Sequence, residues 1–228
     1  KKHVSASLYQ GYRFPGEIIG HCVWLYFRFS LSFRDVEELM AERGGILTYE
    51  TIRQWCLKFG QTDANELKRR RGKTGDTWHL DEVYLKINGK THYLWRAVDQ
   101  DGNVLDILVQ SRRNRQAAKK FFRKLLKSDK LASYAAAKKE LMASVQHRQH
   151  KGLNNRAERS HQPTSNESEP CDGSASPGHA QRFLSAFGPI LDHFRPKRHR
   201  LAAEDYRALM RDRFWVWNEV ASGKTAVS

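Results

Sequence analysis

The chain has 228 residues, with 40 Lys or Arg against 25 Asp or Glu, and a formal net charge of +15 at pH 7. This length fits one large domain or two modest ones, and the basic excess favours nucleic acid over a membrane surface as the partner. We expect no membrane span, because no apolar run approaches roughly 20 residues, and no signal peptide, because the N-terminal residues from Lys1 to His3 do not begin one. The scattered Cys22, Cys56 and Cys171 indicate reduced thiols in an intracellular protein and no zinc site.

Three helices are predicted in the N-terminal third. Apolar residues recur at helical spacing over residues 15–29, with a proline at the first position, where proline suits a helix. Ser32 is a favourable N-cap for a second helix, which Gly44 should stop. Thr48 is predicted to cap a third helix over residues 49–59.

Helix, short glycine-bearing turn and helix form the helix-turn-helix pattern, so residues 1–63 are predicted to be a DNA-binding domain whose last helix enters the groove. The alternative is a plain three-helix bundle that binds nothing. The high positive charge of the chain favours DNA binding. The outward face of the third helix offers side chains suited to base edges and phosphates: Glu50, Arg53, Gln54 and Lys58.

A run of basic residues follows this domain. Residues 64–77 are predicted to form a linker that lies along DNA phosphates. The cations expected to make those contacts are Lys68, Arg69, Arg70 and Arg71.

Residues 78–110 are predicted to form an antiparallel meander of three short strands. Asn88 and Gly89 form a strong hairpin signal, because both accept a positive φ, and Gly102 repeats the signal after Asp101. β-branched and aromatic residues fill the segments between these turns.

Asp81 is the unusual residue of the first strand. A carboxylate in a core strand is costly unless a cation compensates it. One interpretation places Asp81 on the solvent face of an alternating strand. The other makes it a metal ligand at the centre of the sheet.

Five ordered motifs connect the chain to a known family. They are Trp-His-Leu-Asp-Glu-Val-Tyr at residue 78, Arg-Ala-Val-Asp at 96, Ser-Asp-Lys-Leu-Ala-Ser-Tyr at 128, His-Arg-Gln at 147 and Leu-Asn-Asn-Arg-Ala-Glu at 153. With the preceding helix-turn-helix, this set resembles bacterial transposases of insertion-sequence family six. The similarity covers nearly the whole chain.

The resemblance implies an α/β chain with a ribonuclease-H-like catalytic domain, a mixed sheet with flanking helices, over residues 78–195. It also implies a DDE triad of Asp81, Asp129 and Glu158. Arg156, beside the last acid, is expected to contact DNA. Asp99 and Asp106 are the rival second carboxylates by chemistry, but they lie beside the second hairpin turn and suit structural roles better.

The predicted triad suits phosphodiester chemistry. Cleavage and strand transfer need an activated water or 3′-hydroxyl and a stabilised leaving oxygen, which two Mg²⁺ ions about 3.5–4 Å apart supply. Such hard cations prefer carboxylate oxygens and water, and Mn²⁺ is expected to substitute. This role would account for Asp81 as a metal ligand of the sheet.

Two departures from the family pattern predict that this copy is inactive. The strand that should precede Asp129 is missing, because a helix predicted over residues 115–127 leads straight into it. Residues 165–176 hold three acids and no Lys or Arg, where the family has a basic helix. A flexible acidic loop is one explanation. We favour a compensated pair of frameshifts, because a frame two bases away can encode an arginine-rich peptide, with the original frame restored near Pro177.

The sequence therefore predicts a transposase that binds the terminal inverted repeats of its element and target DNA, and catalyses Mg²⁺-dependent cleavage and strand transfer. The alternative is a DNA-binding remnant without catalysis. Residues 196–228 are expected to form a C-terminal helix and tail. The resemblance further implies a homo-oligomer when active and a cytoplasmic, nucleoid-associated location in a bacterium.

Overall fold

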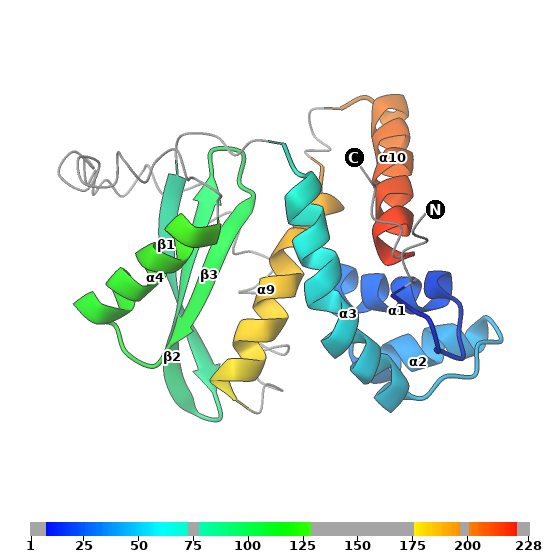
Figure 1. Cartoon of the computed structure of the whole chain (residues 1–228), viewed down its shortest axis with the longest axis horizontal. Coiled ribbons are helices and arrows are strands. Elements are labelled where there is room, and N and C mark those ends of the chain that lie inside the picture. The colour runs from blue at the N-terminus through cyan, green and yellow to red at the C-terminus, as the bar shows by residue number, and fades with distance from the viewer. Residues whose placement is uncertain (1–7, 73–77, 129–175, 197–200, 223–228) are drawn as a thin grey trace, which may run out of the picture. The chain divides into compact units, whose positions relative to one another are not determined.

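The structure, a computed structural model, describes residues 8–72, 78–128, 176–196 and 201–222 (Figure 1). The chain forms two compact units. A helical unit comprises residues 1–72 and 185–228, and a sheet unit comprises residues 73–184.

The described part of the helical unit is built on three N-terminal helices: α1 (Gly16–Phe29), α2 (Phe33–Glu42) and α3 (Tyr49–Arg70). The second half of α9 (Pro177–His193) and all of α10 (Ala203–Ala221) complete it. Helix α3 packs against α1, α2 and α10. The side chains at the centre are almost fully buried: Ile19, Val23, Val36, Ile52, Phe59 and Phe194.

Local capping contacts confirm the predicted starts of α2 and α3. The Ser32 hydroxyl accepts the Asp35 N–H at 3.1 Å, and the Asp35 carboxylate accepts the Ser32 N–H at 2.8 Å, which completes a capping box. The Thr48 hydroxyl accepts the Thr51 N–H at 3.3 Å. After α2, Gly44 adopts a φ of +77°, as expected of a residue that ends a helix.

The predicted end of the third helix at residue 59 is wrong, because α3 continues to Arg70. Gly60 does not stop it, since a Cβ atom there would collide with the Phe27 ring. Buried residues Asp63, Ala64 and Leu67 prolong the buried stripe beyond Gly60. Residues 64–70 are therefore helix and not the linker expected from the sequence.

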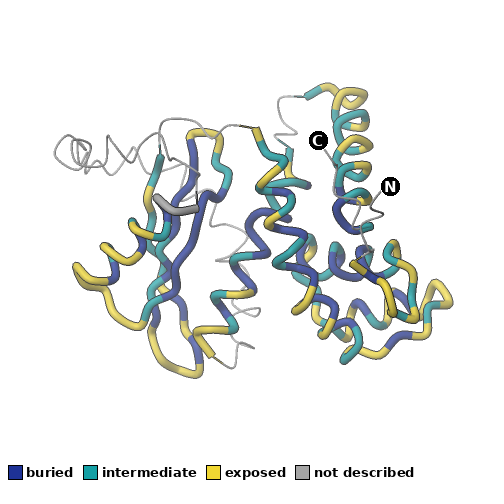
Figure 2. Tube along the Cα trace, in the orientation of Figure 1, coloured by how far each residue is buried: buried dark blue, intermediate teal, exposed yellow. Residues whose placement is uncertain are grey.

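The described strands of the sheet unit form the predicted meander, with the order β1-β2-β3 and antiparallel pairing throughout. They are β1 (Trp78–Ile87), β2 (Lys90–Asp99) and β3 (Val104–Gln110). Asn88 and Gly89 have φ values of 50° and 73°, so the first turn uses the backbone conformation that the sequence predicted. In the second turn Gly102 has a φ of 87°, whereas Asp101 does not adopt the positive φ expected of an Asp-Gly turn. Figure 2 shows β2 and β3 as the most buried strands.

One face of the sheet is covered by α4 (Arg115–Ser128), which contacts β3 (Figure 1). The apolar cluster beneath it comprises Ala97, Leu105, Leu108, Phe121 and Leu125, with Trp78 and Trp95 packed against it.

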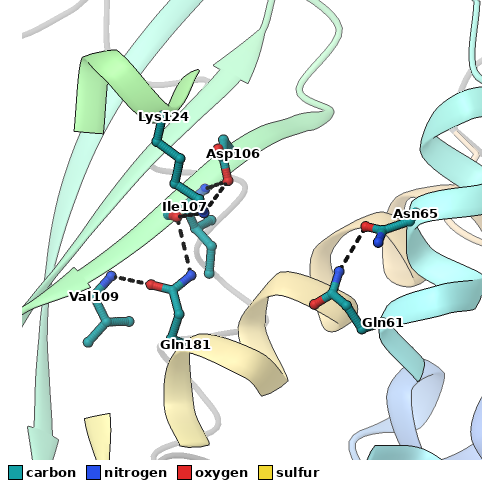
Figure 3. Close-up of polar contacts among 7 residues, drawn as sticks. All are labelled: Gln61, Asn65, Asp106, Ile107, Val109, Lys124 and Gln181. Carbon is teal, nitrogen blue, oxygen red and sulfur yellow. Dashed lines mark hydrogen bonds and ion pairs between the residues drawn. The ribbon is translucent and has the colours of Figure 1, made fainter. Parts of the chain in front are cut away.

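Side chains cap the outer edge of β3 (Figure 3). Gln181, in the first half of α9, accepts the Val109 N–H at 2.7 Å and donates to the Ile107 carbonyl at 3.3 Å. Lys124 of α4 donates to the same carbonyl at 2.7 Å, and the Asp106 carboxylate accepts the Ile107 N–H at 2.7 Å. Backbone groups that would otherwise be open to another strand are therefore satisfied.

Candidate nucleic-acid interface and catalytic carboxylate

The first turns of α3 carry a polar cluster centred on Glu50. The Arg53 Nε and Nη2 groups donate to the two Glu50 carboxylate oxygens, each at 2.7 Å, and Gln54 donates to one of them at 3.2 Å. The Arg53 and Glu50 side chains are each 43% exposed. Hydrogen bonds from Arg53 and Gln54 lower the pKa of Glu50 to about 2, so Glu50 is ionised at neutral pH.

Lys58 lies one turn beyond this cluster on α3. Its ammonium donates to the Tyr12 hydroxyl at 2.6 Å and sits 4.9 Å from the centre of that ring. At the start of α3, Arg34 of α2 lies over the Tyr49 ring at 5.0 Å, a cation–π contact between the two helices. Ile46, in the loop between α2 and α3, is 92% exposed.

The basic residues at the end of α3 make contacts inside the helical unit. Arg70 pairs with Glu66 at 3.1 Å and with Glu219 of α10 at 2.7 Å. Arg71 pairs with Asp192 of α9 at 3.4 Å. These two arginines join α3 to the C-terminal helices. The sequence had instead predicted that they contact DNA phosphates from a linker.

Their two neighbours are placed differently. Arg69 pairs with Glu66 at 2.7 Å, yet its side chain stays 61% exposed. Lys68 is partly exposed in the last turns of α3.

Asp81 lies in β1, opposite Arg96 of β2. Alternation along β1 places it on the side of the buried Leu85 and Ile87, whereas Tyr84 is exposed on the other side. One carboxylate oxygen accepts the Glu82 N–H at 2.7 Å. The half-buried carboxylate therefore lies on the side of β1 that carries Leu85 and Ile87, and its role as a metal ligand stays a prediction.

Asp129, Arg156 and Glu158 lie outside the described residues, so of the predicted triad the structure places Asp81. The residue directly before Asp129 is the last of α4. Within the described ranges, no group of three His, Cys, Asp or Glu side chains is arranged to hold a metal ion.

The two rival carboxylates have structural contacts. Asp99 is 2% exposed and accepts the N–H groups of Asp101 and Asn103, each at 2.9 Å, which fixes the second hairpin turn. The Asp106 carboxylate pairs with the Lys124 ammonium at 2.7 Å. Both arrangements support the structural roles expected from their positions.

The sequence placed Glu50 among the DNA-facing residues but did not foresee that it holds Arg53 and Gln54. The spacing contained the signal, since residues three and four apart on a helix are neighbours. The buried Asp63 was also missed, and the premature end predicted for the helix is the reason.

Comparison with known proteins identifies the class of the chain. The family profile of the DDE domain matches residues 75–197, which is more than half of the chain. The chain therefore belongs to the DDE-domain family of bacterial insertion-sequence transposases. A DDE domain implies a ribonuclease-H-like fold, and the described meander and α4 are parts of the matched region.

Particular relatives agree with this assignment. The transposase for insertion sequence-like element IS431mec of Staphylococcus aureus is 34% identical over 115 residues, covering 50% of this chain and 51% of the relative. The transposase for insertion sequence element IS257 in transposon Tn4003, also from Staphylococcus aureus, is 33% identical over the same length and coverage. The chain thus spans about half the length of these curated relatives.

Two further findings concern solved structures and membrane spans. No solved structure matches the chain. Among the helices that the structure describes, none has the length and apolar character needed to cross a membrane.

Proposed function

We propose that this chain binds double-stranded DNA at the terminal inverted repeats of an insertion sequence, with α2 and α3 acting as a helix-turn-helix. The polar cluster on the first turns of α3 carries the proposal, because the N-terminal residues of a recognition helix contact base edges. In this role Arg53 and Gln54 face bases, while Lys58 and the exposed Arg69 face phosphates. The net charge of +15 supplies the attraction for the backbone.

We propose further that this copy does not catalyse strand transfer. The chemistry expected of the family needs Asp81, Asp129 and Glu158 around two Mg²⁺ ions, or Mn²⁺ in their place. Helix α4 ends at Ser128, which leaves no residues for a strand before Asp129. Catalytic groups must lie within roughly 0.5 Å of productive geometry, and a shift of about 1 Å can lower the rate on the order of a hundredfold.

The transposase family to which the chain belongs suggests further proposals. Arg156 is proposed to contact DNA beside Glu158, and active relatives are expected to work as homo-oligomers on element ends and target DNA. The proposed location is the bacterial cytoplasm, at the nucleoid.

Binding to two duplexes tests the first proposal. One duplex is enriched by the wild-type chain from a randomised library, and the other has random sequence. Arg53→Ala should weaken binding to the enriched duplex by about 1–3 kcal/mol and change binding to the random duplex little. Arg69→Ala should weaken both equally and reduce the salt slope by about 0.9. Equal loss on both duplexes for Arg53→Ala would remove its base-reading role.

A strand-transfer assay on the ends of the element, with Mg²⁺ and then Mn²⁺, tests the second proposal. No joined product is expected while end binding persists. Strand transfer that disappears in Asp129→Ala would overturn the proposed inactivity and leave the DNA-binding proposal intact.

A further inference from the structure

The contact between Glu50 and Arg53 uses one particular edge of the guanidinium. The Arg53 Nε and Nη2 groups donate to the Glu50 carboxylate, so the guanidinium edge between these two nitrogens is occupied. The Nη1 group and the second Nη2 hydrogen lie on the other edge, and none of the hydrogen bonds that Arg53 makes to Glu50 involves them. A guanidinium edge of this kind binds the O6 and N7 acceptors of guanine in the major groove.

The carboxylate also fixes the arginine. A bidentate pair holds the planar guanidinium in one orientation, and the third hydrogen bond, from Gln54, holds the carboxylate itself. An arginine without such a partner samples many rotamers and reaches nearby phosphates as readily as bases.

Charge gives the pair a second effect. Sequence-independent binding to DNA depends on cations that replace condensed counterions at phosphates. Because the ionised Glu50 neutralises Arg53, this pair adds little to that attraction. The pair therefore favours a base contact, which depends on geometry, over a phosphate contact, which depends on charge.

We propose that Glu50 is a specificity-determining residue, which positions Arg53 to read one guanine and withholds it from phosphates. This inference rests on the proposed DNA-binding function of α3. Glu50 acts through Arg53 and is a positioning residue.

Glu50→Gln in the full chain tests the inference, with the enriched and random duplexes as probes. Glu204→Gln is the matched control, because it removes the same charge from an exposed site in the first turn of α10, at the end of that helix far from α2 (Figure 1). Affinities are measured by fluorescence anisotropy over a range of salt concentrations.

Glu50→Gln should lower the ratio of enriched to random affinity roughly 5- to 100-fold, the discrimination lost with one bidentate base contact. On random DNA its salt slope should steepen by about 0.9, because the released Arg53 adds one phosphate contact. Glu204→Gln should leave the ratio unchanged. The positioning role would be overturned if Glu50→Gln and Glu204→Gln had the same ratio of enriched to random affinity. An unchanged salt slope for Glu50→Gln on random DNA would also overturn it.

A double-mutant cycle separates positioning from direct contact. If Glu50 acts through Arg53, Glu50→Gln should not lower the ratio further in an Arg53→Ala background. Additive losses would mean that Glu50 reads a base itself, for example the cytosine amino group, and would overturn the inference. A wild-type chain that enriches no sequence would instead remove the proposed function on which the inference rests.

Discussion

Asp63 is a fully buried carboxylic acid in α3. Neither of its oxygens has a hydrogen-bond partner among the described residues. Burial raises its pKa to about 8, so the side chain is held protonated at neutral pH. Its proximity also raises the pKa values of Tyr9 and Cys56, although burial is the larger cause for both.

This protonation makes the stability of the helical unit depend on pH. The folded pKa lies above the unfolded value near 4, so the native state holds a proton that the unfolded chain releases. From about pH 6.5 to pH 8, wild-type stability should therefore fall by up to about 1.4 kcal/mol per pH unit, and it should level off above the folded pKa. Below that window the partly buried His193, whose pKa is lowered to about 4, acts in the opposite direction.

Asp63→Asn should remove this fall of stability with pH, because the amide does not titrate. Chemical denaturation at a series of pH values measures the free energy of unfolding of both proteins. Glu38→Gln, at an exposed site on α2, should retain the wild-type slope. A wild-type profile that is flat between about pH 6.5 and pH 8 would mean that Asp63 is ionised and compensated in solution.

At the scale of the elements, a side chain of α9 satisfies backbone hydrogen-bonding groups at the outer edge of β3. Gln181 contacts two backbone groups of β3, and the Val109 N–H depends on it. Gln181→Leu should therefore lower the free energy of unfolding by about 1–3 kcal/mol, the cost of leaving a buried donor unsatisfied.

Urea denaturation and hydrogen exchange at the Val109 amide measure this effect. Arg182→Ala is the control, since Arg182 is the exposed neighbour on the same helix. Unchanged exchange at Val109 in Gln181→Leu would show that another group accepts its hydrogen.

Local sequence signals predicted the elements well where the cause is local. Ser32 and Thr48 bond to their own helices, and Asn88 needs only its own backbone conformation, so caps and turns were predictable. The extension of α3 was not, because Gly60 resembles a helix stop until the Phe27 ring is placed beside it. Asp81 was predicted as a site residue from its motif, and this stays a prediction because the carboxylates expected to join it lie outside the described residues.

At the scale of the whole molecule, the observed units differ from the predicted segments. The sequence suggested a DNA-binding domain over residues 1–63 and a separate C-terminal helix. In the structure α10 packs on α1 and α3, and the Ala221 Cβ lies so close to Gly20 that a Cβ atom there would be 2.5 Å away. The ion pair between Arg70 and Glu219 adds a second connection.

A fragment of residues 1–72 should therefore fail to unfold cooperatively on its own, because it exposes the surface that α10 buries. Thermal circular dichroism measures this, and joining residues 185–228 to the fragment through a flexible linker should restore a cooperative transition. A sharp transition in the isolated fragment would show that α10 is dispensable.

The discontinuous helical unit has a consequence for protein synthesis. The ribosome releases residues 1–72 early, but their partners in residues 185–228 emerge only after the entire sheet unit has been made. A prematurely terminated chain thus lacks a complete helical unit. A change of reading frame within residues 129–175 is compatible with this unit only if the frame returns before residue 185. The frame restoration predicted near Pro177, where α9 begins, satisfies that condition, so an altered gene can still encode both parts of the helical unit.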